Sequence, residues 1–216
     1  RAQPRRHLKE IIKRLHAGAA PEDVRPQLKT LVQQTTSEEI AAMEQELIAE
    51  GMSVEEIMGM CDLHHQVLQE IISPPETVGI PAGHPLDTFR RENQALKEKV
   101  AEARGLLGRM IELPDEGGVD AVLPQLQSVL DEIRQVEKHY QRKEQLLFSV
   151  LERHGVSGPS KVMWGKDDEV RGLLKTLNEA LAAGNAPAGE WKVVAREVAE
   201  PALAAVEEMI AKEENI

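Results

Sequence analysis

Apolar residues recur every three or four positions along most of the chain, a pattern that predicts amphipathic α-helices. No segment shows the alternation of apolar and polar residues that is typical of a half-buried strand. Ala, Leu, Glu and Lys, which favour helices, dominate the long segments, and only 2% of the residues are aromatic. The sequence therefore predicts an all-α protein with an aliphatic core.

The first part of the chain predicts a small helical domain over residues 1–75, built from four short helices. Pro21 suits the first turn of the second helix, and Gly51 suits the end of the third. The third and fourth helices each begin with the spacing of a capping box, Thr36-Ser-Glu-Glu39 and Ser53-Val-Glu-Glu56. We find no catalytic constellation in this domain.

Cys61 and His64 stand out in this domain because they lie three positions apart and would share one face of a helix. Structural zinc normally needs four ligands, and no second cluster of Cys and His is visible in the sequence. We therefore interpret the pair as a small buried thiol beside a surface histidine.

Residues 76–83 predict a linker, because the stretch from 73 to 83 contains three prolines and two glycines. The following residues, 84–216, predict four long helical segments. The segments are expected to begin at Pro85 with His84 as the cap, near Val119, at Asp167 and near Gly189. We expect a loop over Gly155–Gly165, a cap formed by Asp167-Asp-Glu169, and a kink or break at Pro201.

Glu144 lies near the middle of the apolar face of the second long segment, and His139 lies toward the edge of that face. The face is formed by Ile133, Tyr140, Leu147 and Leu151. A carboxylate that points into a core costs several kcal/mol unless it is neutralised, paired or bound to a metal. The combination suggests a metal site between helices. The simpler interpretation is a partly exposed glutamate, or one paired with a base on another helix.

The end of the chain repeats part of this segment at an offset of 70 positions. The run Val136-Glu137, Tyr140 and Glu144-Gln-Leu146 corresponds to Val206-Glu207, Ile210 and Glu214-Asn-Ile216. The repeat places Glu214 where the first copy has Glu144. Two helices that each project a carboxylate inward are typical of di-iron bundles.

Charge and composition exclude several classes of function. The 26 basic and 37 acidic residues give a net charge of −11, which disfavours nucleic-acid binding. A single cysteine excludes an internal disulfide and fits a reducing compartment. No apolar run approaches the ~20 residues of a membrane span, and no secretory signal is visible. We therefore expect a cytoplasmic protein that binds neither membrane nor nucleic acid.

Four motifs follow one another in the second part of the chain. They are Gly83-His84-Pro, His139…Lys143-Glu144-x-Leu-Leu-Phe148…Leu-Glu-x-His-Gly155, Val162-Met-Trp-Gly165 and Asp168-Glu-x-Arg171. In this combination they resemble the hemerythrin-like HHE cation-binding domain. Residues 7–72 resemble the DUF438 domain that precedes it in bacterial and archaeal proteins, including Glu44-Gln-Glu-Leu and Cys61-Asp-x-His64.

The resemblance implies an up-down four-helix bundle that holds a non-haem iron pair, with another divalent metal as the alternative. The ligands that it implies are His84, His139, Glu144 and Glu214, with Glu213 as a near alternative to Glu214. The family pattern continues beyond the last three residues of this chain, so the fourth helix is expected to be truncated.

Two positions depart from the family pattern. Asp87 and Asp167 stand where the family usually has histidine, so they are candidate replacement ligands. A carboxylate is shorter, anionic and harder than an imidazole, and the site would become richer in oxygen donors. This change argues against reversible oxygen binding and shifts the expected metal preference.

The resemblance implies a protein that senses or binds O2, NO or redox state in signalling, as a homodimer or with a downstream signalling domain. An enzyme is the less favoured class of protein. If the protein is an enzyme, we expect a di-iron peroxidase or an iron-repair activity. The remaining alternative is a metal-free or metal-impaired helical interaction domain whose carboxylates pair with bases. Asp87 and Asp167 favour this alternative, because each replaces an imidazole donor.

Overall fold

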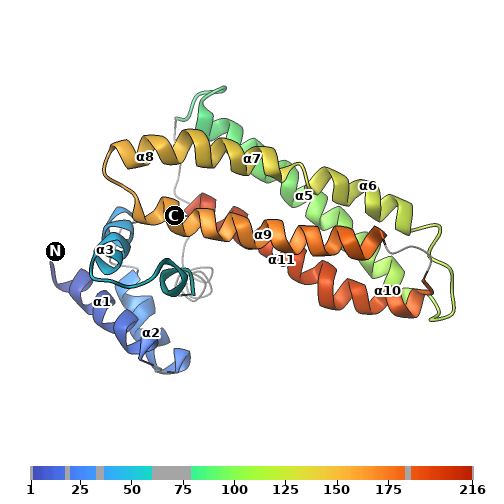
Figure 1. The fold of residues 1–216 in the computed structure, drawn as a ribbon, viewed down its shortest axis with the longest axis horizontal. Coiled ribbons are helices and arrows are strands. Elements are labelled where there is room, and N and C mark those ends of the chain that lie inside the picture. The colour runs from blue at the N-terminus through green and yellow to red at the C-terminus, as the bar shows by residue number, and fades with distance from the viewer. Residues whose placement is uncertain (1, 18–19, 33–36, 60–78, 183–185, 216) are drawn as a thin grey trace. The chain divides into compact units, whose positions relative to one another are not determined.

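The computed structural model describes residues 2–17, 20–32, 37–59, 79–182 and 186–215 (Figure 1). All regular structure in these ranges is helical, which confirms the predicted fold class. The chain divides into two compact units, named here the first and the second unit. The first unit contains Arg1–Glu76, Glu144–Lys166 and Glu214–Ile216, and the second contains Thr77–Lys143 and Asp167–Glu213.

The two compact units divide the chain differently from the predicted domains, which stay a prediction. The change of unit at Thr77 falls within the predicted linker, 76–83. Residues 144–166, which we assigned to the bundle, group instead with the first unit. The Cys61 and His64 pair lies outside the described residues, so its interpretation stays a prediction.

The first unit contains the short amphipathic helices that the pattern predicted. They are α1 (Ala2–His16), α2 (Pro21–Val32) and α3 (Ser37–Ala49), followed by helical residues 54–59. Ile12, Leu28 and Met43 are fully buried in their shared core, and Val162 packs into the same cluster. Residues 144–166 are thus joined to the N-terminal helices by apolar packing.

The boundary between α3 and the next helix confirms two expectations from the sequence. Gly51 ends the preceding turn with a φ of 101°, a conformation that side chains with a Cβ rarely adopt. Ser53 and Glu56 then form the predicted capping box. The Glu56 carboxylate accepts from the Ser53 amide at 2.8 Å, and the Glu56 amide donates to the Ser53 hydroxyl at 3.2 Å.

The second unit is built from four helical stretches of the described chain. The first is α5 (Pro85–Glu112), and the second is α6 (Leu123–Ile133) followed by α7 (Val136–Arg142). The third is the part of α9 (Gly158–Ala182) from Asp167 onward. The fourth consists of α10 (Ala188–Val194), the π-helical η2 (Ala195–Ala199) and α11 (Glu200–Asn215) up to Glu213. A second π-helical segment, η1 (Lys143–Phe148), and α8 (Ser149–Arg153) continue α7.

Ion pairs between the helices show that neighbouring stretches are antiparallel. Lys99 of α5 pairs with Glu132 of α6, and about two turns earlier Glu92 of α5 contacts His139 of α7. The residue number therefore falls along α5 as it rises along α6 and α7. Figure 1 shows the same alternation of direction for α9 and for α10 with α11. The second unit is thus an up-down four-helix bundle, as predicted.

The second long segment is not one continuous helix, which corrects the expectation of a single helix from Val119 to Arg153. α6 begins only at Leu123, since Pro124 suits the first turn of a helix. The turn between α6 and α7 is tightened: the amides of Gln135 and Lys138 each bond to the carbonyl three residues earlier.

The expected loop over Gly155–Gly165 is also wrong for most of its length. α9 begins at Gly158, where Pro159 can occupy the first turn without losing a hydrogen bond. As a consequence, Asp167 lies inside α9 rather than at its start, and it is fully buried. The acidic run at Asp167 therefore does not cap a helix.

Pro201 lies just after a change of helix type in the last helical stretch, which continues past it without a break. The π-helical η2 ends at Ala199, and α11 begins at Glu200, so the proline lies in the first turn of α11. A proline inside a helix lacks an amide hydrogen and clashes with the carbonyl four residues earlier. The wider π-helical turn accommodates both effects.

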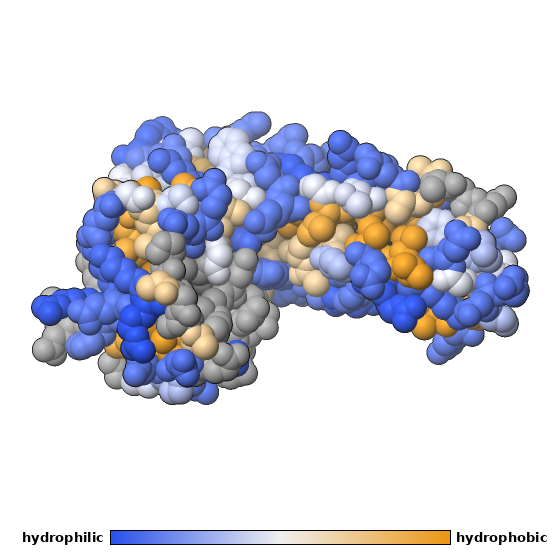
Figure 2. Space-filling view, turned by 60° about the horizontal axis from the view of Figure 1, so that its bottom comes forward, coloured by the Kyte–Doolittle hydropathy of each residue, from blue (hydrophilic) through white to orange (hydrophobic). Residues whose placement is uncertain are grey.

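Aliphatic side chains fill the interior of the second unit, as the low aromatic content predicts. Val100, Leu126, Ile133, Leu177 and Leu203 are all buried. In Figure 2 polar residues cover most of the visible surface, and apolar residues gather in patches between them. No helix within the described ranges combines the length and the apolar character needed to cross a bilayer.

Candidate metal centre

His139 of α7 is buried in the second unit and lies between two carboxylates from different helices. Its Nδ1 lies 2.8 Å from Oε2 of Glu92 on α5, and its Nε2 lies 2.9 Å from Oε2 of Glu213 on α11. The ring of Phe89 meets the imidazole edge-on, with 5.0 Å between ring centroids. Both nitrogens of the histidine are therefore engaged, and its orientation is fixed.

Lys143 lies one helical turn after His139 and enters the same site, because residues four apart share a helix face. Its Nζ lies 2.7 Å from Oδ1 of Asp167 on α9 and also contacts Oε1 of Glu213. The ring of Tyr140 lies beneath the ammonium, with 4.5 Å between Nζ and the ring centroid. The side chain of Lys143 is only 3% exposed and that of Asp167 is 0% exposed.

Glu213 joins the histidine and the lysine into one network. One carboxylate oxygen contacts His139 and the other contacts Lys143, so Glu213 of α11 joins two consecutive turns of the neighbouring helical stretch. Four helical stretches thus each contribute to the centre. Its members are Glu92, His139, Lys143, Asp167 and Glu213.

The electrostatics of the centre favour charged forms of its members. Burial alone would lower the pKa of His139, but the carboxylates of Glu213 and Glu92 raise it above its usual value. Burial alone would raise the pKa of Glu213, but His139 and Lys143 hold it below its usual value. Burial alone would likewise raise the pKa of Glu92, but Arg142 and His139 hold it below its usual value.

Basic and aromatic side chains surround this network. Arg142 forms an ion pair with Glu92, and Arg171 pairs with Glu137 at 2.7 Å. The Tyr140 hydroxyl is buried and has no hydrogen-bond partner among the described residues. Burial, followed by the nearby charge of Glu213, raises the pKa of this phenol well above its usual value.

Two predicted ligands at the start of α5 have other roles in the structure. His84 is exposed and caps the helix, with its Nδ1 accepting from the Leu86 amide at 3.2 Å. Asp87 accepts from the Gly83 amide at 3.0 Å and pairs with Arg91. The hydrogen bond from Arg91 lowers the pKa of Asp87, followed by the one from Gly83. Their contacts do not join them to His139.

The remaining candidates divide between the two units. Asp167 and Glu213 belong to the network around His139 and Lys143. Glu144 is buried and Glu214 is half-buried, and both belong to the first unit. The residue that contacts His139 is therefore Glu213, the alternative that the sequence offered beside Glu214.

Sequence reasoning overlooked two members of this centre, Glu92 and Lys143. The sequence contains an indication that Glu92 points into the bundle, because it follows Phe89 by three positions and so shares the inner face of α5. Lys143 follows His139 by four positions and belongs to the motif Lys143-Glu144-x-Leu-Leu-Phe148. Its burial could not be read from the sequence, because lysine side chains are mostly exposed.

The donor types at this centre suit a metal ion, whereas their present arrangement suits an ammonium. One imidazole nitrogen and several carboxylate oxygens are common ligands of iron, manganese and zinc. The position between Asp167 and Glu213, however, is taken by Nζ of Lys143. Within the part of the chain that the structure describes, no group of three His, Cys, Asp or Glu side chains is arranged to hold a metal.

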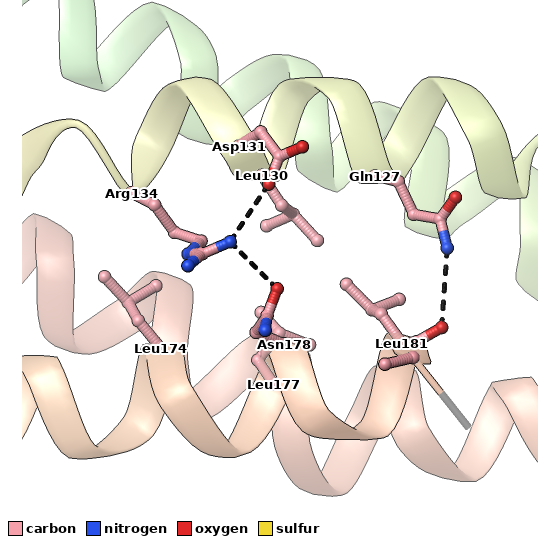
Figure 3. Close-up of a pocket in the computed structure, with 9 residues that line it drawn as sticks. Gln127, Leu130, Asp131, Arg134, Leu174, Leu177, Asn178 and Leu181 are labelled. Carbon is pink, nitrogen blue, oxygen red and sulfur yellow. Dashed lines mark hydrogen bonds and ion pairs between the residues drawn. The ribbon is translucent and has the colours of Figure 1, made fainter.

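A shallow cavity between α6 and α9 is a weaker candidate for a binding site (Figure 3). Arg134 donates to Asn178 at 3.0 Å, and Gln127 reaches the Leu181 carbonyl at 3.4 Å. The cavity holds about 220 Å³, less than the ~300–1,000 Å³ of typical small-molecule sites. These side chains serve to join the two helices.

Comparison with known families agrees with this architecture. The family described as hemerythrin HHE cation binding domain matches residues 84–216, and a family of unknown function, DUF438, matches residues 8–74. Neither a curated protein nor a solved structure matches the chain. The match over 84–216 covers more than half of the sequence. The chain therefore belongs to the hemerythrin HHE cation-binding family and has a DUF438 region in its N-terminal part.

Proposed function

We propose that the second unit binds a metal ion through His139, Asp167 and Glu213. The observation that carries this proposal is the contact between the buried His139 and the largely buried Glu213, with Nε2 of the imidazole 2.9 Å from the carboxylate. A buried histidine beside a carboxylate from another helix is the way bundles build metal sites. Membership in a cation-binding family supports the same function.

Glu92 supports this assignment by its position behind the histidine. Metal-ligating histidines usually donate their second ring nitrogen to a carboxylate, which fixes the tautomer and the orientation of the ring. The 2.8 Å contact between Glu92 and Nδ1 provides this arrangement and leaves Nε2 as the donor toward a metal. Arg142 pairs with Glu92 and holds it in place.

We propose iron as the metal, because imidazole and carboxylate donors suit it. Lys143 holds Asp167 and Glu213 together beside His139, and a rearrangement of these side chains would provide donors for one metal ion. A pair of irons would need further ligands. The number of irons in each chain therefore distinguishes a mononuclear centre from the expected pair.

We further propose that the protein senses O2, NO or redox state in signalling and is not primarily an enzyme. Three protein ligands leave coordination positions open, and an open position is what binding of a small molecule requires. A fused DUF438 region fits a signalling role, because a sensor must pass its state to another part of the protein. A cytoplasmic location agrees with the single cysteine.

A second candidate function is that of a metal-free helical interaction domain. The observation that favours it is the ammonium of Lys143, which pairs with Asp167 and Glu213 without a metal. In this case the charged centre would serve only to fix the packing of the bundle. Metal content decides between the two candidates.

The test is the metal content of the full chain, grown with iron and purified without oxygen. Wild type is compared with Glu213→Gln and with His154→Ala, a control that removes an exposed histidine outside the centre. We expect about one iron per chain in wild type and in the control, and loss of iron in Glu213→Gln. A change in the visible spectrum when air or NO is admitted would support sensing. Wild type without metal under these conditions would contradict the proposed function.

A further inference from the structure

Lys143 occupies the position in the bundle where a cation is needed. Two carboxylates from different helices, Asp167 and Glu213, contact its ammonium, and the face of Tyr140 lies 4.5 Å from it. Lysine is almost never fully buried unless it is paired. This side chain is buried because the centre compensates its charge from three directions.

We propose that the ammonium of Lys143 competes with a metal ion for Asp167 and Glu213, so that metal binding at this centre is an exchange of cations. This inference rests on the proposed function, because it concerns the same ligands. Without a metal, the ammonium neutralises the carboxylates and maintains the bundle. With a metal, Lys143 has to leave them.

The first argument is geometric. Oδ1 of Asp167 and Oε1 of Glu213 both lie within hydrogen-bonding distance of one nitrogen atom. A metal that bound these two oxygens would occupy nearly the same place as Nζ. The two cations therefore exclude each other at this position, both by volume and by charge repulsion.

The second argument concerns the side chain itself. Lysine carries its charge on a flexible stem of four carbons, so the ammonium can move away while the backbone of η1 stays in place. His139 contacts the other oxygen of Glu213, Oε2, so its imidazole would turn toward a metal at this position to become a third ligand. The exchange therefore requires changes in side chains rather than in the fold.

The inference predicts that removing the charge of Lys143 strengthens metal binding. Lys143→Met keeps an unbranched side chain of similar length and leaves two buried carboxylates in need of a cation. Lys143→Gln is a second variant, whose amide can still donate to Asp167 and support folding. Lys138→Met serves as the matched control, because Lys138 lies on the exposed side of the same helix.

The experiment measures binding of Zn²⁺ and, without oxygen, of Fe²⁺ to the full chain by calorimetry. The metal-induced shift of the unfolding temperature provides a second readout. We expect Lys143→Met and Lys143→Gln to bind metal on the order of 10–100-fold more tightly than wild type, a gain as large as the loss that follows when a favourable neighbour of a metal ligand is removed. Lys138→Met should bind as wild type does.

The outcomes separate this inference from the proposed function. Weak binding by wild type with tighter binding by the Lys143 variants supports both. Binding only by the Lys143 variants supports the competition and contradicts metal binding by wild type. Equal or weaker binding by folded Lys143 variants overturns the competition while it leaves the proposed function standing. Absence of binding in every folded protein overturns both.

Discussion

The ammonium of Lys143 lies 2.7 Å from a carboxylate oxygen of Asp167, and the structure buries both side chains. Such a pair is expensive to form, because both charges lose their hydration. It is retained when further contacts compensate each charge, as Glu213 does for Lys143. The relationship explains why an aspartate lies in the middle of α9 and why a lysine points into the bundle.

The ion pair predicts the stability of single and double variants. Asp167→Ala leaves the ammonium without one of its carboxylates, and we expect a loss of about 3–5 kcal/mol in the free energy of unfolding. Replacing both residues, in Lys143→Met with Asp167→Leu, should recover part of that loss, because the Lys143–Asp167 pair is removed together and Glu213 keeps its contact with His139. Urea denaturation of metal-free protein measures these differences.

The control for this series is Asp168→Ala. Asp168 pairs with Arg171 at 2.7 Å, but its side chain is 62% exposed. Exposed ion pairs contribute about 0–1 kcal/mol, so this variant should remain close to wild type. Equal losses in Asp167→Ala and Asp168→Ala would show that burial of the Lys143 pair does not control stability.

The Tyr140 hydroxyl predicts an unusual response to Tyr140→Phe. A buried hydroxyl without a partner costs about 1–3 kcal/mol in desolvation, and phenylalanine avoids this cost while it keeps the ring beneath Lys143. We therefore expect Tyr140→Phe to leave thermal stability unchanged or to raise it. Tyr140→Leu, which removes the aromatic face, should lower stability and serves as the comparison. A marked loss in the phenylalanine variant would indicate that the hydroxyl has a partner in solution.

The raised pKa of Tyr140 predicts how stability depends on alkaline pH. The neutral phenol is favoured in the folded state, so the unfolded chain ionises first as the pH rises above the usual value of 10.0. The contribution of this residue to stability is fully present below that pH and is lost as the pH rises through the folded pKa. Because the chain has a single tyrosine, the ultraviolet phenolate band reports Tyr140 alone. A phenolate band that appears at the usual pH, with the helices intact, would contradict this prediction.

The capping box of the first unit predicts a local effect of Ser53→Ala. This variant removes the hydroxyl that accepts from the Glu56 amide, and loss of such a cap costs about 1 kcal/mol. We expect faster amide exchange in residues 54–59, measured by mass spectrometry, and unchanged exchange in α5. Ser53→Asp should behave as wild type, since aspartate is an equally good cap. Faster exchange in both variants would mean that the hydroxyl does not act as a cap.

The sequence by itself determined the helices and several of their ends. The recurrence of an apolar residue every three to four positions is a local property of the chain. It predicted α5 and the helices of the first unit. Local hydrogen bonding also explains why Pro85 begins α5 and why Ser53 and Glu56 begin the next helix. The same local argument failed at α9, because Asp167 has the chemistry of a helix cap as well as that of a buried ion-pair partner.

Only the tertiary structure decided which charges meet inside the bundle. The sequence pointed to His139 and to Glu213 or Glu214, but it could not select Glu213 or find Glu92 and Lys143. The face of a helix on which a residue lies follows from its position in the sequence. Its partner depends on the rotation and the offset of the other helices, and a difference of one residue turns a side chain by about 100°. Whether a carboxylate meets a metal or an ammonium is therefore decided by packing between helices.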